Sequence, residues 1–147
     1  MLTEGDIGVA RFSVEIELAN NDDLAAVRRG HLQPDKVRRV KVQGWVDSGA
    51  SRLVLPQALA EKLGLTPTGK VHVTYANGRS ATRDRVEGIY VELMGRHGTF
   101  SGSTEPRRKT VLIGAIVLEE LDFLIDPLKE RLYPRDPKMV LSWAEEQ

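Results

Sequence analysis

The stretch Trp45-Val46-Asp47-Ser48-Gly49-Ala50-Ser51 places an acidic residue between two apolar segments. A strand-like run leads into Asp47, and Leu53-Val54-Leu55 follows directly after the small residues. Aspartate is rarely buried without a hydrogen-bonding partner. Asp47 is therefore either held by the amides of its own turn or placed between the strands for chemistry.

Composition limits the fold and the classes of function. The chain has 147 residues, of which 41% are hydrophobic and 29% charged, as in ordinary soluble globular proteins. We therefore expect one domain over residues 1–147, with a core of about 11–133 and a C-terminal tail of about 134–147. Basic and acidic residues balance at 21 each, so no nucleic-acid partner is predicted. No long apolar run is present, so we expect no membrane partner and a cytoplasmic location.

Residue types also limit the possible catalytic groups. The chain has no cysteine and only three widely separated histidines. This excludes disulfides and thiol catalysis and argues against a metal centre, so we predict no metal and no cofactor. Three short basic stretches are expected to lie on solvated faces: Arg28-Arg29, Arg38-Arg39 and Arg107-Arg108-Lys109.

Apolar periodicity in the first half of the chain predicts two long strands before Asp47 and a short strand after it. Asn77-Gly78 is a strong hairpin signal, and the polar arm that follows it is expected to project into solvent. The expected elements up to this arm are strands Arg11–Leu18, Val37–Val46 and Arg52–Leu55, a possible turn or two of helix at Asp23–Arg28, helix Pro56–Leu63 ending at Gly64, and hairpin arms Val71–Tyr75 and Ser80–Val86.

The second half adds short strands separated by turns. The expected elements are strand Gly88–Met94, turn Gly95–Gly98, loop Ser101–Pro106, strand Thr110–Gly114, helix Ala115–Leu121, strand Phe123–Asp126 with a returning partner in Leu128–Tyr133, and a possible helix at Met139–Glu146. Many short strands with frequent turns and two short helices predict a mostly β fold, either a closed antiparallel barrel or a sandwich.

A single carboxylate at a strand end is a poor catalyst, but two facing carboxylates share a proton. One then acts as general base on water while the protonated one polarises a carbonyl, without any need for metal, thiol or histidine. The sequence holds one Asp-Ser-Gly, so the second must come from a second chain. In a twofold dimer Asp47 would face its own equivalent, and the Ser48 hydroxyl could brace the pair.

These residues resemble a known family. Asp47-Ser48-Gly49-Ala50 is similar to the Asp-Thr/Ser-Gly-Ala signature of retropepsin-like aspartic proteases. Val111-Leu112-Ile113-Gly114 before a helix resembles the apolar segment that threads beside the family's catalytic loop. Tyr75–Arg79 lies where the family has its flap. The Leu63-Gly64-Leu65 helix end is similar to that of the single-domain bacterial retroviral-like members. The resemblance covers about Arg11 to Tyr133.

The resemblance implies a homodimer of closed β-barrel subunits that cleaves an extended peptide or protein substrate. The implied catalytic loop residues are Asp47, Ser48 and Gly49, and the implied substrate-binding residues are Ala50, Tyr75, Ala76, Asn77, Gly78 and Arg79. Two alternatives stay open. The hairpin at Asn77-Gly78 could be a plain hairpin with no substrate contact. The whole chain could be a non-catalytic peptide-binding or dimerisation module, because one fold hosts unrelated functions.

Overall fold

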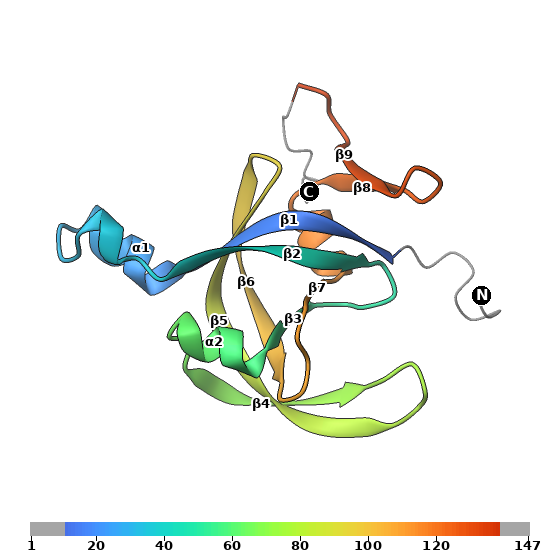
Figure 1. The fold of residues 1–147 in the computed structure, drawn as a ribbon, viewed down its shortest axis with the longest axis horizontal. Coiled ribbons are helices and arrows are strands. Elements are labelled where there is room, and N and C mark those ends of the chain that lie inside the picture. Colours follow the sequence, from blue (N-terminus) through green and yellow to red (C-terminus); the bar gives the residue numbers. More distant parts are fainter. Residues whose placement is uncertain (1–10, 139–147) are drawn as a thin grey trace, which may run out of the picture.

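The computed structural model describes residues 11–138, and its strands and helices follow one another as Figure 1 shows. The strands are β1 (Arg11–Asn20), β2 (Arg39–Asp47), β3 (Leu53–Pro56), β4 (Pro67–Thr74), β5 (Ser80–Leu93), β6 (Arg96–Glu105), β7 (Val111–Ile113), β8 (Phe123–Asp126) and β9 (Arg131–Pro134). The helices are α1 (Asn21–Arg28), the 3₁₀ turn η2 (Pro34–Lys36), α2 (Gln57–Lys62) and α3 (Ala115–Glu120). The predicted helix at Met139–Glu146 lies outside the described residues.

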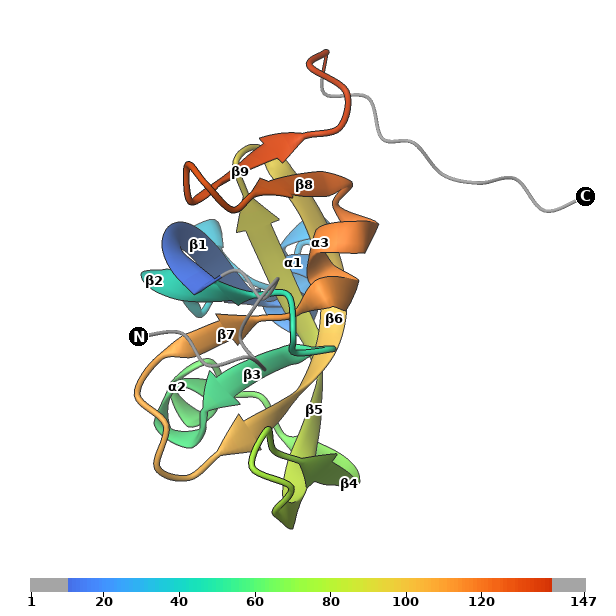
Figure 2. The same ribbon diagram turned by 90° about the vertical axis from the view of Figure 1, so that its right-hand side faces the viewer.

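Six strands close into a barrel in the order β1-β2-β7-β3-β6-β5, because β1 also pairs with β5. Strand β4 extends β5 beyond the barrel, and β8 and β9 form a separate hairpin at the opposite end (Figures 1 and 2). The predicted mostly β closed barrel is confirmed. The pairs β2–β7 and β3–β6 are parallel, whereas the other barrel pairs are antiparallel. The segment from α2 to β5 makes the long crossover that the parallel pair β3–β6 requires.

The barrel interior follows the alternation that the sequence predicted. On β1, Phe12, Ile16 and Leu18 are buried, and the polar residues between them face outward. On β2, Val46 is fully buried, whereas Trp45 on the opposite face is 42% exposed. Residues at every second position therefore line the core, and the chain leaves the barrel at the end of β2, where Asp47 lies.

Three expectations for the middle of the chain were wrong. Ser80–Val86 and Gly88–Met94 are one strand, β5, which bends at a bulge where Gly88 has a φ of +68°. The turn is not Gly95–Gly98: it is Met94-Gly95, which both have positive φ, and β6 begins at once with Arg96. Ser101–Pro106 is not a loop, because β6 continues to Glu105.

The sequence of β6 does not predict a strand over its whole length, because few of its residues are large and apolar. Its buried positions include Ser103 and Thr104. At Gly102 an added Cβ would lie 2.5 Å from the carbonyl oxygen of Leu53. The close approach of β3 therefore requires glycine at position 102. With glycine, serine and threonine at buried positions, β6 lacks the alternation of apolar and polar residues that identifies most strands.

The other predicted elements are present, with boundaries shifted by a few residues. Helix α2 ends as expected, since Gly64 has a φ of +69° and the Leu65 amide donates to the Ala60 carbonyl at 2.9 Å. The suggested helical turns at Asp23–Arg28 are the larger part of α1, and β8 and β9 form the expected hairpin.

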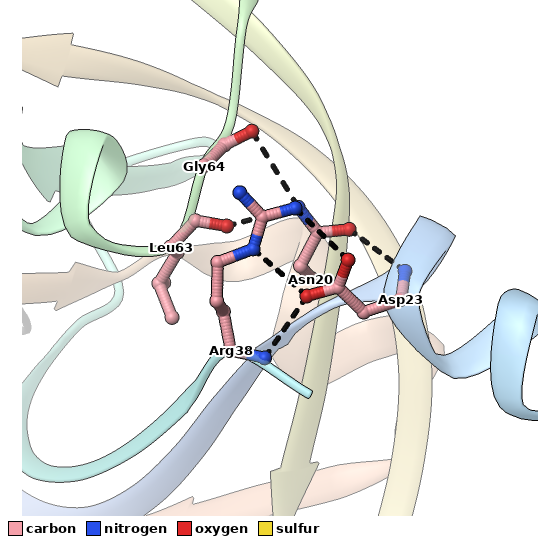
Figure 3. Close-up of polar contacts among 5 residues, drawn as sticks. All are labelled: Asn20, Asp23, Arg38, Leu63 and Gly64. Carbon is pink, nitrogen blue, oxygen red and sulfur yellow. Dashed lines mark hydrogen bonds and ion pairs between the residues drawn. The ribbon is translucent and has the colours of Figure 1, made fainter. Parts of the chain in front are cut away.

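A cluster of polar side chains joins the end of β1, α1, α2 and the segment before β2 (Figure 3). Buried Asn20 caps α1 by accepting from the Asp23 amide at 3.0 Å, and its side-chain amide donates to the Leu63 carbonyl at 2.9 Å. The Asp23 carboxylate accepts from the backbone amide, Nε and Nη2 of Arg38, each at 2.9 Å. Arg38, expected on a solvated face, thus holds these elements together.

The Arg38 side chain also explains the charge state of the cluster. Its hydrogen bonds to Asp23 lower the pKa of that carboxyl and raise the pKa of the Arg38 guanidinium. A group whose pKa is lower in the folded than in the unfolded protein stabilises the fold at pH values above its unfolded pKa. This stabilisation is lost as the pH falls through the pKa of the folded protein. Both members are therefore ionised at neutral pH.

We expect Asp23→Asn to lower the free energy of unfolding by about 1–2 kcal/mol at pH 7, because the guanidinium loses its paired acceptor. The difference from wild type should shrink as the pH falls below about 3.9, the usual pKa of an unfolded aspartate, toward the lowered pKa of Asp23 in the folded protein. Urea unfolding at pH 7 and pH 3 measures both effects. Asp84→Asn is the control, since it removes the Lys70 pair of the exposed hairpin and should cost under about 0.5 kcal/mol at either pH. An equal loss for Asp23→Asn at both pH values would contradict this account.

Candidate active site

Asp47 ends β2 and lies at the start of the turn that leads to β3. It is buried, with a side chain only 12% exposed. The Gly49 amide donates to its Oδ1 at 2.9 Å, and the Ala50 amide donates to its backbone carbonyl at 3.1 Å. The turn therefore supplies a partner for one carboxylate oxygen, as the capping interpretation required.

The second carboxylate oxygen of Asp47 faces a cation of the same chain. Oδ2 lies 3.5 Å from Nε of Arg11, the first residue of β1. The register of the β1–β2 pair brings these residues opposite each other. The Arg11 side chain is 56% exposed, so this is a weak, solvated ion pair. No local sequence pattern predicts this pair, because the two residues are 36 positions apart in the chain.

The turn after Asp47 is fixed from behind by the segment Val111–Gly114 and α3. Strand β7 lies between β2 and β3, pairing Ile113 with Val46 and Leu112 with Val54. At Gly114 an added Cβ would lie 2.5 Å from the Arg52 carbonyl oxygen and 2.6 Å from its nitrogen. Only glycine fits such backbone contact, so the apolar segment does thread beside the Asp47 turn.

The first turn of α3 adds hydrogen bonds to the same loop. The Ala115 amide donates to the Ala50 carbonyl at 2.8 Å, and the Ile116 amide donates to the Ser51 carbonyl at 2.9 Å. The free amides at the start of the helix are thereby satisfied by the loop. Ser48 and Ala50 are half-buried, and Gly49 is exposed. The four residues Asp47 to Ala50 thus form one rigid turn at the barrel surface.

The remaining candidate residues form the predicted β4–β5 hairpin. The Tyr75 amide donates to the Arg79 carbonyl at 2.8 Å, and the Gly78 amide donates to the Tyr75 carbonyl at 2.9 Å. The Asn77 side chain accepts from the Arg79 amide at 2.9 Å, and Gly78 has a φ of +84°. The hairpin and the Asp47 turn lie on the same side of the barrel (Figures 1 and 2).

A network that the sequence did not predict ties this hairpin to the end of β6. The Tyr75 hydroxyl donates to the Glu105 carboxylate, at 2.8 Å from Oε2 and 3.1 Å from Oε1. Arg83 Nε donates to the same Oε1 at 2.9 Å. Burial, followed by the Glu105 hydrogen bond and charge, raises the pKa of Tyr75. Glu105 was missed because its segment was read as loop.

The concave surfaces of a single chain lie away from these residues. Two concavities, of about 390 and 400 Å³, occur on the described surface, and neither is lined by Asp47 or the hairpin tip. Within residues 11–138 no three His, Asp or Glu side chains are grouped to hold a metal ion. In the same part of the chain no helix is long and apolar enough to span a membrane.

Comparisons with known proteins identify the family of the chain. A solved structure similar to this chain is the solution structure of Simian Foamy Virus (mac) protease, with 17% sequence identity and a TM-score of 0.47, covering 73% of this chain and 91% of that one. A search of curated proteins gave no significant match. The family model described as aspartyl protease matches residues 36–131, which is more than half of the chain and includes Asp47, the hairpin and Gly114. The chain belongs to the aspartyl protease family.

Proposed function

We propose that this protein is a homodimeric aspartic endopeptidase in which Asp47 of each chain contributes one carboxylate. The observation that carries the proposal is the position of Asp47. It is a buried acid at a strand end, in a turn fixed by Gly114 and α3, in a chain of the aspartyl protease family. Substrates are peptides or proteins in extended form.

A second chain supplies what one chain lacks. The sequence has a single Asp-Ser-Gly, so one chain supplies one carboxylate of a dyad. A twofold axis beside this turn brings Asp47 close to Asp47 of the partner subunit. The two surfaces then form the walls of a groove, and each chain provides half of the site.

The proposed chemistry follows from placing two carboxylates together. They hold one proton between them, because two negative charges at this distance repel strongly. The ionised carboxylate takes a proton from water as the oxygen attacks the scissile carbonyl carbon, and the protonated one donates to the carbonyl oxygen. The resulting tetrahedral diol collapses when the amine leaving group receives a proton from the pair. The pair titrates as a unit, so activity is favoured in acid.

The turn residues have distinct supporting roles in this proposal. The Gly49 amide already holds Oδ1 of Asp47, which leaves Oδ2 to meet the second carboxylate and water. Arg11 lies beside that oxygen at 3.5 Å, and its exposed side chain can move aside as the dimer forms. Ser48 braces the two turns, and Ala50 lines the groove.

The β4–β5 hairpin serves as the flap that covers the peptide. Extended peptides bind by adding a strand to exposed backbone. Ala76, Asn77 and Gly78 present backbone at the exposed tip, and Tyr75 and Arg79 close its base with a hydrogen bond of 2.8 Å. The hydrogen bond from the Tyr75 hydroxyl to Glu105 holds the hairpin tip at a fixed distance from the end of β6.

One observation favours a second function, a peptide-binding or dimerisation module without catalysis. In the single chain the Asp47 carboxylate is engaged by the Gly49 amide and by Arg11, so its charge has local partners and needs no catalytic use. Activity measurements separate the two functions.

We expect Asp47→Asn to abolish peptide cleavage while leaving the melting temperature and dimer unchanged, since the amide keeps the shape but cannot serve as base. Cleavage of a peptide library by wild type should be faster at about pH 5 than at pH 7. A hydroxyl-bearing transition-state mimic should raise the melting temperature of wild type but not of Asp47→Asn. Equal cleavage by both proteins would refute the catalytic assignment, and a stable dimer that neither cleaves nor binds the mimic would establish the module.

We expect Tyr75→Phe to loosen the flap, because it removes only the hydroxyl that bonds Glu105. Loss of about 1 kcal/mol of hydrogen-bond energy corresponds to roughly fivefold faster exchange of the hairpin amides. The KM for peptides should rise by a similar factor with little change in kcat. Arg85→Gln is the matched control, since Arg85 lies on β5 and pairs only with exposed Glu87 at 3.3 Å. Unchanged amide exchange in Tyr75→Phe would show that the network does not hold the hairpin.

A further inference from the structure

A second surface, away from Asp47 and the hairpin, combines an apolar floor with a basic rim. It is a groove of about 400 Å³ between α2 and the start of β7, next to the middle of β2. In both views α2 lies beside the connection between β6 and β7 (Figures 1 and 2). Its volume falls at the small end of the range for ligand pockets. We call it the basic groove.

Three apolar side chains form the floor of the basic groove. Val111 at the start of β7 is buried, whereas Val42 of β2 and Leu59 of α2 are only half-buried. Val42 and Leu59 pack against the core with one side and leave the other side in the groove. No aromatic ring is among its lining residues. The floor therefore offers contact for one large apolar side chain.

The charged residues at the rim have one sign. Lys62 comes from the end of α2, and Arg108 and Lys109 come from the connection before β7. Of the residues that the structure describes, no acidic one lines the groove. Glu61, the acidic neighbour of Lys62, takes a hydrogen bond from Gln57 on another flank of α2. Like charges gathered without a counter-charge repel one another, so an anion bound here gains from all three.

Within residues 11–138 these cations form no ion pair. Eight ion pairs link described residues, and none includes Lys62, Arg108 or Lys109. Arg108 is nevertheless held in place, because its Nε donates to the Thr110 carbonyl at 2.8 Å. That bond leaves the terminal nitrogens of the guanidinium available. Arg108 and Lys109 belong to the basic stretch that was predicted to lie on a solvated face, and Lys109 is exposed.

We propose that the basic groove binds an acidic protein segment that carries one large apolar side chain. The apolar side chain fills the floor, as an anchor does at a protein interface. Flanking carboxylates meet the rim and give selectivity for acidic partners. A nucleic acid fits less well, because single strands are held by stacking on aromatic rings and none lines the groove. This binding does not depend on the proposed dyad.

The test uses fluorescein-labelled pentapeptides and fluorescence anisotropy with the full chain. The binding peptide has a central Phe with two Glu on each side. The comparison peptides replace Phe with Ser, or all Glu with Lys. We expect saturable binding of the first peptide only, weakening as salt is raised. Asp47→Asn should bind the peptide as wild type does, which separates this proposal from the catalytic one.

Surface variants locate the binding. Lys62→Glu and Lys109→Glu each reverse one rim charge and should each weaken binding by at least about fivefold. Ala58→Glu should block it, because Ala58 is exposed on α2 at the groove and does not belong to the core. Lys129→Glu is the matched control, an exposed lysine in the β8–β9 turn at the other end of the molecule.

Several results would overturn the proposal. Equal binding of the Ser peptide would show that charge alone attracts the probe. Weakening by Lys129→Glu as large as that by Lys62→Glu would show that net charge, and not the groove, governs binding. Binding to phosphatidylserine vesicles or single-stranded DNA in preference to the Phe peptide would assign the groove to another class of partner.

Discussion

The contact on which the structure depends is that between the backbone of Gly114 and the backbone of Arg52. Any side chain at position 114 would lie within 2.5 Å of the Arg52 carbonyl oxygen. This contact lets β7 insert between β2 and β3, which closes the barrel, and places the start of α3 under the turn after Asp47. Barrel closure and the position of the candidate acid thus have one cause.

The hairpin is attached differently from the Asp47 turn. The turn is held by backbone contacts with β7 and α3, whereas β4 pairs only with β5 and lies outside the barrel. Beyond that pairing, Glu105 receives the Tyr75 hydroxyl and the Arg83 side chain. Side-chain bonds at an exposed edge open more readily than packed backbone. The backbone contacts hold Asp47 in place, whereas the hairpin beside it can open when its side-chain hydrogen bonds break. This combination suits the proposed site, which must admit a peptide and then cover it.

Local patterns sufficed to predict much of the local structure around the candidate site. The acid between strands, the Asn77-Gly78 hairpin and the apolar run ending at Gly114 were all placed from neighbouring residues, and so was the alternation of β1 and β2. Contacts between distant residues were missed. Arg11 meets Asp47 through strand register, and Glu105 lies on a strand whose buried positions are small or polar. No local pattern contains such information, because barrel closure decides the neighbours.

Two buried acids show how the structure separates a structural carboxylate from an available one. Asp23 accepts three hydrogen bonds of 2.9 Å from Arg38, so both oxygens are satisfied and its pKa is lowered. Among the described residues, Asp47 accepts one amide at Oδ1, and its Oδ2 has a looser contact of 3.5 Å with a solvated arginine. A fully satisfied carboxylate gains little from another partner. The less satisfied one still has capacity for water or a second carboxylate, as the proposed chemistry requires of Asp47.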